Sequence, residues 1–296
     1  MCSSPTSEGR LMNLQGVLSA RTKNISMNAC RPSRCVLIAT TLCMAGCATL
    51  PNGRSWGDDA TIVPGWERVR ASAINAASDP WVWAPLAGGA VTQVDHFDRK
   101  ISNWARRDTP VFGSQAQATT WSNELRSASV AADAVTVLLT PSGEWGASWV
   151  LDKLKGYAVD LAAATTAIET TTLLKDATQR TRPNDSGTDS FPSGHAATSA
   201  VYTRLATVNL DQIDMSDGAR GALDTGLQVL NFGTAWARIE GGWHYPSDTL
   251  MSIALGNFCG MFFNDAFLGL DTSRAKVAFA PRPGGGELRW QFRFAP

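Results

Sequence analysis

The chain has 296 residues, in which 26 Lys and Arg balance 26 Asp and Glu, so its formal net charge is zero. Hydrophobic residues make up 44% of the sequence. A neutral chain of this composition lacks the excess positive charge of nucleic-acid-binding proteins, and it has too many apolar residues for a disordered protein. We therefore expect a folded protein, about one domain in size, with no nucleic-acid partner.

The N-terminal part has the pattern of a bacterial export signal. Residues 35–50 carry no charge, follow Arg31 and Arg34, and include the sequence Met44-Ala45-Gly46-Cys47. A positive region, a short apolar core and a small-residue cleavage site are the parts of a secretory signal, and this apolar core is too short to span a bilayer comfortably. The Ala-Gly-Cys sequence resembles a lipobox, in which the signal is cut before the cysteine and the cysteine is acylated.

This pattern predicts a lipoprotein signal peptide and N-terminal extension over residues 1–46, with Met27 as the true start and Cys47 as the lipidated residue. Ala48 at the next position is typical of lipoproteins that travel to the outer membrane of Gram-negative bacteria. We therefore expect a lipid-anchored, periplasm-facing protein. The cysteines that would be lost with the signal are Cys2, Cys30, Cys35 and Cys43.

Cys259 is then the one cysteine left besides Cys47, so no internal disulfide is expected. Cys259 lies in an apolar run and is predicted to be a buried thiol.

Helical periodicity and capping residues predict a helical domain over residues 64–271, after a tether at 47–63. Charged residues interrupt its longer apolar stretches, so no membrane-spanning helix is expected. The predicted helices cover 64–78, 80–106 in broken form, 115–139, 145–179 with a weak point at Gly156, 196–208, 217–239 and 246–268.

Residues 272–296 depart from the helical pattern. Leu288, Trp290, Phe292 and Phe294 alternate with polar residues, which is typical of a half-buried strand. The segment around Val277 and Phe279 is its expected partner. The sequence thus predicts a C-terminal β-hairpin.

Three clusters of polar residues stand out in the helical part, and the first is Lys175 with Arg182-Pro183. The two cations are seven residues apart, close to two helical turns, so we expect both on the same face of one helix that ends at Arg182-Pro183. Residues 184–190 are Asn, Asp, Ser, Gly and Thr, a loop composition.

The second cluster is Pro192-Ser193-Gly194-His195, just before the helix predicted at 196–208. Ser193 is expected near an N-cap. There free backbone N–H groups, and the positive end of the helix dipole, can hold an anion.

The third cluster contains Arg238, His244 and Asp248. His244 and Asp248 are four residues apart, so we expect them on one helical face with Pro246 in the first turn. An aspartate so placed can accept the proton of one imidazole nitrogen and leave the other free to attack. Fixed positive charge combined with imidazole and backbone donors suits a phosphate group.

Other interpretations of these residues remain open at this point. Lys175 and Arg182 fit a solvated helix face, and His244 with Asp248 fits a surface pair or two metal ligands. A serine hydrolase using Ser193 is conceivable, although no Gly-x-Ser-x-Gly sequence surrounds it. Two of the three histidines fall in the clusters, and the third, His96, is expected in a surface or capping role.

Together the clusters resemble the type 2 phosphatidic acid phosphatase superfamily, which also includes bacterial class A acid phosphatases and vanadium haloperoxidases. The pattern of that superfamily is Lys, six residues, Arg-Pro; then Pro-Ser-Gly-His; then Arg, five residues, His, three residues, Asp. It covers Lys175 to Asp248 here, with one departure, Ala237 in place of the usual Ser.

The resemblance implies an all-α helical bundle of the acid phosphatase/vanadium haloperoxidase type, and a role for each motif residue. His244 would be the nucleophile, Asp248 would orient it, and His195 would protonate the leaving oxygen and then activate water. No metal is implied. The phosphate-binding groups would be Lys175, Arg182 and Arg238, with the N–H groups of Ser193 and Gly194.

The resemblance therefore predicts a metal-independent phosphatase that hydrolyses phosphomonoesters or pyrophosphates, with lipid phosphates among the candidates, through a phosphohistidine. It needs no cofactor, and vanadate is an expected inhibitor. One alternative is a haloperoxidase, for which vanadate would be the cofactor. Another is a non-catalytic envelope lipoprotein that retains the site only to bind phosphate. In each case the expected membrane contact is the acyl chain on Cys47.

Overall fold

The computed structural model describes residues 48–50, 53–270, 275–282 and 285–292. The predicted signal peptide, the predicted start Met27 and the predicted lipidation site Cys47 lie outside these residues.

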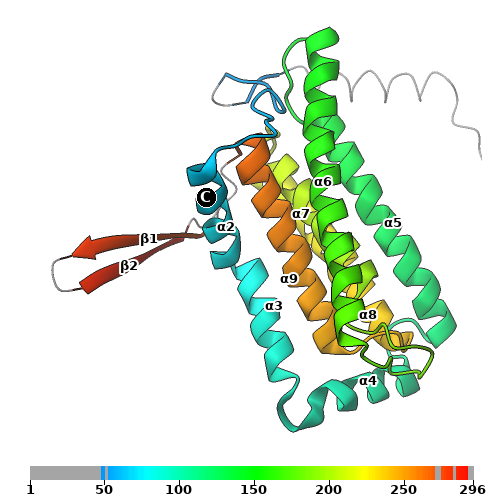
Figure 1. The fold of residues 1–296 in the computed structure, drawn as a ribbon. Helices are drawn as coiled ribbons and strands as arrows, with labels where there is room; N and C mark the ends of the chain where they lie inside the picture. Colours follow the sequence, from blue (N-terminus) through cyan, green and yellow to red (C-terminus); the bar gives the residue numbers. More distant parts are fainter. Residues whose placement is uncertain (1–47, 51–52, 271–274, 283–284, 293–296) are drawn as a thin grey trace, which may run out of the picture. The chain divides into compact units, whose positions relative to one another are not determined.

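The described part is mainly helical, which confirms the predicted all-α class (Figure 1). Its helices follow the predicted order, and the last of them continues into a short π-helical turn. The elements are α2 (Trp66–Ser78), α3 (Pro80–Val91), the 3₁₀ turn η1 (Val94–His96), α4 (Phe97–Asp108), α5 (Gln115–Leu139), α6 (Ala147–Thr178), α7 (Gly194–Asp211), α8 (Asp217–Glu240), α9 (Pro246–Phe263) and η2 (Asn264–Leu268).

Helices α7 and α9 pack along each other at the centre of the bundle; α5, α6 and α8 contact α7, and α3 contacts α9 (Figure 1). Helix α7 is buried along nearly its whole length. Small residues allow α9 to approach α7 closely. A Cβ atom on Gly256 would lie 2.6 Å from the Cβ of Ala200, so only glycine fits this helix crossing.

Side-chain caps fix several helix starts where the sequence predicts them. The Asp79 carboxylate accepts the Trp81 N–H at 2.8 Å, with Pro80 in the first turn. Ser114 and Ser216 cap α5 and α8 in the same way. These caps satisfy N–H groups that have no partner inside the helix.

Part of the predicted tether is packed against the bundle. Trp56 is fully buried with Leu50, Val137 and Leu268. The N–H of Trp56 donates to the Pro141 carbonyl at 2.8 Å. The segment is therefore held by a large aromatic side chain as well as by backbone hydrogen bonds.

Gly156 has a different role from the predicted weak point, because α6 runs through it without a break. A Cβ atom at this position would overlap the six-membered ring of the Trp56 indole. The glycine thus makes the space in which Trp56 is buried.

Two acidic residues lie inside the bundle, Asp133 on α5 and Asp160 on α6, and both are fully buried. Burial raises the pKa of Asp133 to about 8. Burial, followed by the charge of Asp133, raises the pKa of Asp160 well above its ordinary value. Both side chains are therefore expected to be neutral at pH 7.

The predicted C-terminal hairpin is confirmed by two antiparallel strands, β1 (Ala275–Arg282) and β2 (Gly285–Phe292). Val277 lies opposite Trp290 and Phe279 opposite Leu288 in the register. Across the described segments, no helix combines the length and apolar character that crossing a membrane requires.

Replacement of Gly156 by Ala is expected to destabilise the protein by about 1–3 kcal/mol, because the new methyl group competes with the Trp56 indole for one space. The measurement is urea unfolding. Gly221→Ala in α8 is the control, since a Cβ atom there meets nothing within 4 Å; it should be neutral or stabilise by up to about 1 kcal/mol. Equal free energies of unfolding for the two variants would contradict this packing.

Candidate active site

The three clusters come from helix ends and the loops between them. Lys175 lies in the last turn of α6, His195 in the first turn of α7, and Arg238 in the last turn of α8. His244 precedes α9, and Asp248 lies in the first turn of that helix. After burial, which is the largest cause, the charges of Arg238, Lys175 and Arg182 lower the pKa values of both His195 and His244, so the clusters lie in one site.

Trp243 joins two of the cations. The guanidinium carbons of Arg182 and Arg238 each lie 4.8 Å from the centroid of its ring. The indole N–H donates to Thr119 Oγ1 at 2.8 Å, which fixes the ring. Trp243 therefore holds two arginines close together by cation–π contacts.

Lys175 and Arg182 do meet, but not on one helix face as predicted. Helix α6 ends at Thr178, and Gln179 has a left-handed φ of 44°, so Arg182 belongs to the following loop. The left-handed Gln179 ends the helix, and Arg182 itself is disfavoured in helical conformation because it precedes Pro183. The two side chains converge instead on Asp189, whose Oδ2 lies 3.6 Å from Lys175 Nζ and 2.5 Å from Arg182 Nη2.

Asp189 is an anion inside the cationic site. Partial burial raises the pKa of its carboxyl, but Arg182 and Lys175 outweigh that effect and the net shift is downward. Asp189 is therefore ionised at neutral pH. Its side chain is 47% exposed, so an incoming anion can displace it.

Arg238 is the most buried of the three cations, with 6% of its surface exposed. Burial, followed by the charges of Arg182 and Arg126, lowers the pKa of its guanidinium to about 10. Its Nη1 donates to Ser122 Oγ at 3.4 Å. Among the described residues, the buried Nε atoms of Arg182 and Arg238 have no acceptor. Two such donors on arginines that contact the same Trp243 ring are suited to an anionic ligand.

His195 is held by Asn123 of α5, whose Oδ1 lies 2.8 Å from His195 Nε2. Its pKa falls to about 3, because of burial first and then the charges of Arg238 and Arg126. His195 is neutral in the empty site at pH 7.

His244 is oriented by a backbone group rather than by Asp248. Its Nδ1 lies 2.6 Å from the Ser190 carbonyl oxygen, whereas Asp248 Oδ2 is 3.9 Å away. Because a carbonyl can only accept, Nδ1 carries the proton and Nε2 keeps its lone pair. Burial, followed by Arg238, lowers the pKa of His244 well below its ordinary value.

The prediction that His244 and Asp248 share one helical face is wrong. Pro246 is the first residue of α9, and Tyr245 before it is extended, with φ −82° and ψ 160°. Helix geometry therefore does not extend back to His244.

Asp248 is fully buried and accepts three hydrogen bonds. Their donors are Arg180 Nη1 at 2.5 Å, Ser190 Oγ at 2.6 Å and the Tyr245 N–H at 2.8 Å. Burial raises the pKa of Asp248 to about 6, although Arg180 acts against this rise. Asp248 thus orients Ser190, and the carbonyl of Ser190 orients His244.

The two predicted backbone donors differ in availability. Ser193 caps α7 as predicted, accepting the Ala196 N–H at 3.4 Å, but its own N–H already donates to Ser252 Oγ at 2.7 Å. This N–H is not available to a phosphate, contrary to the prediction. Gly194 is the first residue of α7, so its N–H has no partner within the helix.

Sequence reasoning missed several residues of this site. Asp189 and Ser190 lie in the interval that composition indicates as a loop, and Arg180 stands two residues before Arg182. Asp98 and Asn123 carry no local signal, because they reach the site from α4 and α5. His96, expected in a surface or capping role, is exposed and occupies the N-cap position of α4 without a side-chain capping bond. Cys259 is buried as predicted.

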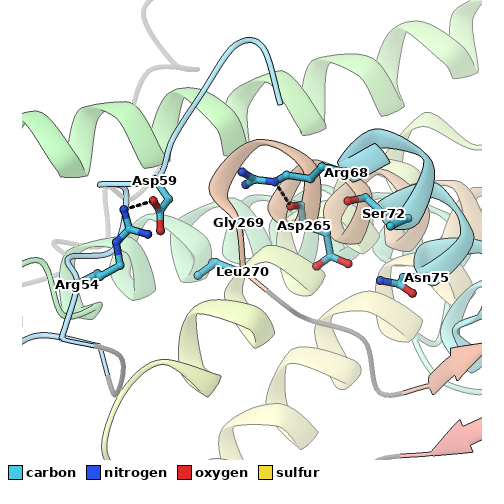
Figure 2. A pocket seen from close by; sticks show the side chains of 9 residues that line it. Arg54, Asp59, Arg68, Ser72, Asn75, Asp265, Gly269 and Leu270 are labelled. Carbon is cyan, nitrogen blue, oxygen red and sulfur yellow. Dashed lines mark hydrogen bonds and ion pairs between the residues drawn. The ribbon is translucent and has the colours of Figure 1, made fainter. Parts of the chain in front are cut away.

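A cavity of 370 Å³ lies away from these residues and is lined partly by Arg54, Asp59, Arg68 and Asp265 (Figure 2). Arg54 is paired with Asp59, and Arg68 Nε donates to the Asp265 carbonyl at 3.0 Å. None of the predicted catalytic residues lines this cavity.

Three cations around two neutral imidazoles, one with a free Nε2 lone pair, match the charge and reactivity of a phosphoryl group. The helical fold and this site define a phosphoric ester hydrolase. Residues 156–268 match the family model of the PAP2 superfamily. This match confirms, over residues 156–268, the resemblance drawn from the motifs.

A solved structure of the first transmembrane PAP2 type phosphatidylglycerolphosphate phosphatase, from Bacillus subtilis, is similar to this chain with a TM-score of 0.47 and 18% identity. The similarity covers 62% of this chain and 92% of the other. No curated protein matches the sequence.

Replacing Asp189 by Asn is expected to tighten the binding of inorganic phosphate by about two- to fivefold, because the carboxylate no longer competes for Arg182 and Lys175. Isothermal titration calorimetry measures the change. Asp185→Asn, which removes an exposed charge from the same loop, is the control and should bind phosphate as the unmodified protein does. Weaker binding by Asp189→Asn would show that Asp189 supports the site rather than competing for it.

Proposed function

We propose that the protein is a metal-independent phosphatase that hydrolyses phosphomonoesters or pyrophosphates through a phosphohistidine on His244. The observation that carries this proposal is the hydrogen bond between His244 Nδ1 and the Ser190 carbonyl, 2.6 Å long, in a site with three cations. It leaves Nε2 unprotonated, and a depressed pKa keeps it so at neutral pH.

In the first step, the Nε2 lone pair of His244 attacks phosphorus, and the bond from phosphorus to the leaving oxygen breaks. A bound phosphate dianion raises the pKa of His195, so this imidazole is protonated in the complex although it is neutral in the empty site. His195 gives its proton to the leaving oxygen. Lys175, Arg182 and Arg238 stabilise the negative charge of the transition state.

In the second step, neutral His195 takes a proton from water, and the water oxygen attacks the phosphohistidine. The bond between phosphorus and Nε2 breaks and inorganic phosphate leaves. Both imidazoles return to their starting states. The cations supply charge stabilisation that a metal ion supplies in other phosphatases.

Lipid phosphates belong to the proposed substrate range. A cavity of 300 Å³ next to Arg180 and Ser247 is lined mostly by apolar groups, among them Leu86, Phe191 and Met251. Helix α3 also exposes Trp83 and Leu86. Apolar surface at this end of the bundle is suited to an acyl chain.

We further propose that Cys47 is acylated and that the protein is anchored in the cell envelope, facing the periplasm, in the outer membrane of a Gram-negative bacterium. The support is the sequence pattern that precedes Cys47. Ala48, the next residue, is already tied to the bundle, because its carbonyl accepts the Gly143 N–H at 2.8 Å.

His244→Ala should abolish both turnover and the trapping of phosphate on the protein, because the nucleophile is removed. His195→Ala should lower kcat about 10²- to 10⁴-fold and should still form the phosphoenzyme from an aryl phosphate, whose leaving oxygen needs little protonation. Trapping is measured as the labelled phosphate that stays on the protein after a rapid quench without acid. The control is exposed His96→Ala, which should behave as the unmodified protein.

Normal activity of His244→Ala would refute this mechanism. Oxidation of bromide by peroxide upon addition of vanadate, without phosphatase activity, would support the haloperoxidase alternative. Phosphate binding without hydrolysis of any phosphoester at any pH would support the non-catalytic one.

Cys47→Ala is expected to move the protein from the membrane fraction to the soluble fraction and to abolish labelling by radioactive palmitate, because the acylated sulfur is lost. Fractionation of Gram-negative cells with immunoblotting measures this change. The control is Cys43→Ala, a substitution within the predicted signal, which should leave the labelling intact. Undiminished labelling of Cys47→Ala would exclude acylation at this residue.

A further inference from the structure

We infer that Asp98 and Arg180 are positioning residues for His244, acting through Asp248 and Ser190. The inference rests on the proposed function, because it concerns the orientation of the proposed nucleophile. Neither residue belongs to the three motif clusters.

Asp98 is a buried carboxylate in the first turn of α4, with 3% of its surface exposed. Its Oδ1 accepts the Ser247 N–H at 2.8 Å, and its Oδ2 accepts the Ser247 hydroxyl at 2.6 Å. Oδ2 also accepts Arg180 Nη2 at 2.5 Å. Asp98 therefore ties α4 both to the start of α9 and to Arg180.

Arg180 connects the two buried carboxylates of this region. One arm of its guanidinium donates to Asp98, and the other, Nη1, donates to Asp248 at 2.5 Å and to Ser247 Oγ at 2.8 Å. Its guanidinium carbon lies 4.3 Å from the centroid of the Tyr245 ring. The planar fork of an arginine can make all these contacts at once, whereas a lysine cannot.

From Asp248 the network reaches His244 in two further bonds. Asp248 Oδ2 accepts the Ser190 hydroxyl at 2.6 Å, and the carbonyl of the same Ser190 lies 2.6 Å from His244 Nδ1. Asp248 Oδ2 also accepts the Tyr245 N–H at 2.8 Å. Asp248 is therefore bonded both to Ser190, whose carbonyl orients the imidazole, and to Tyr245, the residue that follows His244.

The charges in the network act in opposite directions on Asp248. Arg180 lowers the pKa of Asp248, and Asp98 raises it. The groups that face Asp248 are Arg180 from the loop after α6, Asp98 from α4, and His244, which lies 3.9 Å away. Loss of Arg180 and loss of the Asp98 charge must therefore shift the ionisation of Asp248 in opposite senses.

The test is the pH dependence of kcat and KM for Asp98→Asn and Arg180→Met in the full-length protein, with a soluble aryl phosphate as substrate. Both variants should lose about 10- to 100-fold in kcat. KM should change less than about twofold, because the phosphate-binding cations are untouched. The acid limb of the pH profile should move to higher pH in Arg180→Met and to lower pH in Asp98→Asn.

Asp95→Asn and Arg107→Met are the matched controls. Asp95 is exposed and paired with Lys100, and Arg107 is exposed and paired with Asp108. Both controls should retain the kcat and pH profile of the unmodified protein. Acid limbs that do not move, or that move in the same direction in both test variants, would overturn the inference.

If the two test variants do not fold, Ser190→Ala decides the question, because it removes the hydroxyl bonded to Asp248 and keeps the carbonyl bonded to His244. It should lower kcat without a change in KM. Unchanged kcat in Ser190→Ala would overturn the inference and leave the proposed function intact. A wild-type protein that hydrolyses no phosphoester, or an active His244→Ala variant, would instead overturn the proposed function itself.

Discussion

Repulsion among the three cations Lys175, Arg182 and Arg238 in a partly buried site is the constraint on which the rest of the candidate active site depends. Burial and neighbouring positive charges lower the pKa values of Lys175 and Arg238 below their ordinary values. The protein offsets this repulsion with the Trp243 ring, which contacts both guanidinium groups, and with the carboxylate of Asp189. These contacts only partly compensate, since two buried guanidinium N–H groups lack acceptors among the described residues. The remaining positive potential is what attracts an anion to the site.

The direction of the helices makes this concentration of charge possible. Helices α6 and α8 end at the site and carry Lys175 and Arg238 in their last turns, where the negative end of the helix dipole stabilises a cation. Helices α7 and α9 begin at the site, and their positive ends favour an anion. The close packing of α7 on α9 at Gly256 sets the spacing between these two helix starts.

Sequence reasoning identified the chemistry of the site better than its geometry. The motif residues are recognisable because their types and spacing are local properties of the chain. The predicted shared helix faces were wrong in both clusters. Helix α6 ends at Thr178 before the left-handed Gln179, and Pro246 keeps Tyr245 extended, so neither Arg182 nor His244 is helical. Asp98 could not be predicted, since its partners Arg180 and Ser247 lie far along the sequence. Trp56 was likewise hidden in a segment that composition indicates as a tether.

The hydrogen bond between the Ala48 carbonyl and the Gly143 N–H fixes the distance between the start of the described chain and the candidate active site. Gly143 lies just before α6, and Lys175 lies near its other end, 28 residues after Ala147. At 1.5 Å per residue, about 40 Å of helix separates the end of the bundle that Ala48 contacts from Lys175, and the proposed acyl chain would lie near the Ala48 end. A bundle standing upright on the bilayer would then work on molecules in the aqueous space, whereas one lying flat would meet the headgroups of its own leaflet. The tilt of the bundle on the membrane, rather than the chemistry of the pocket, would then decide whether soluble molecules or lipid headgroups reach the site.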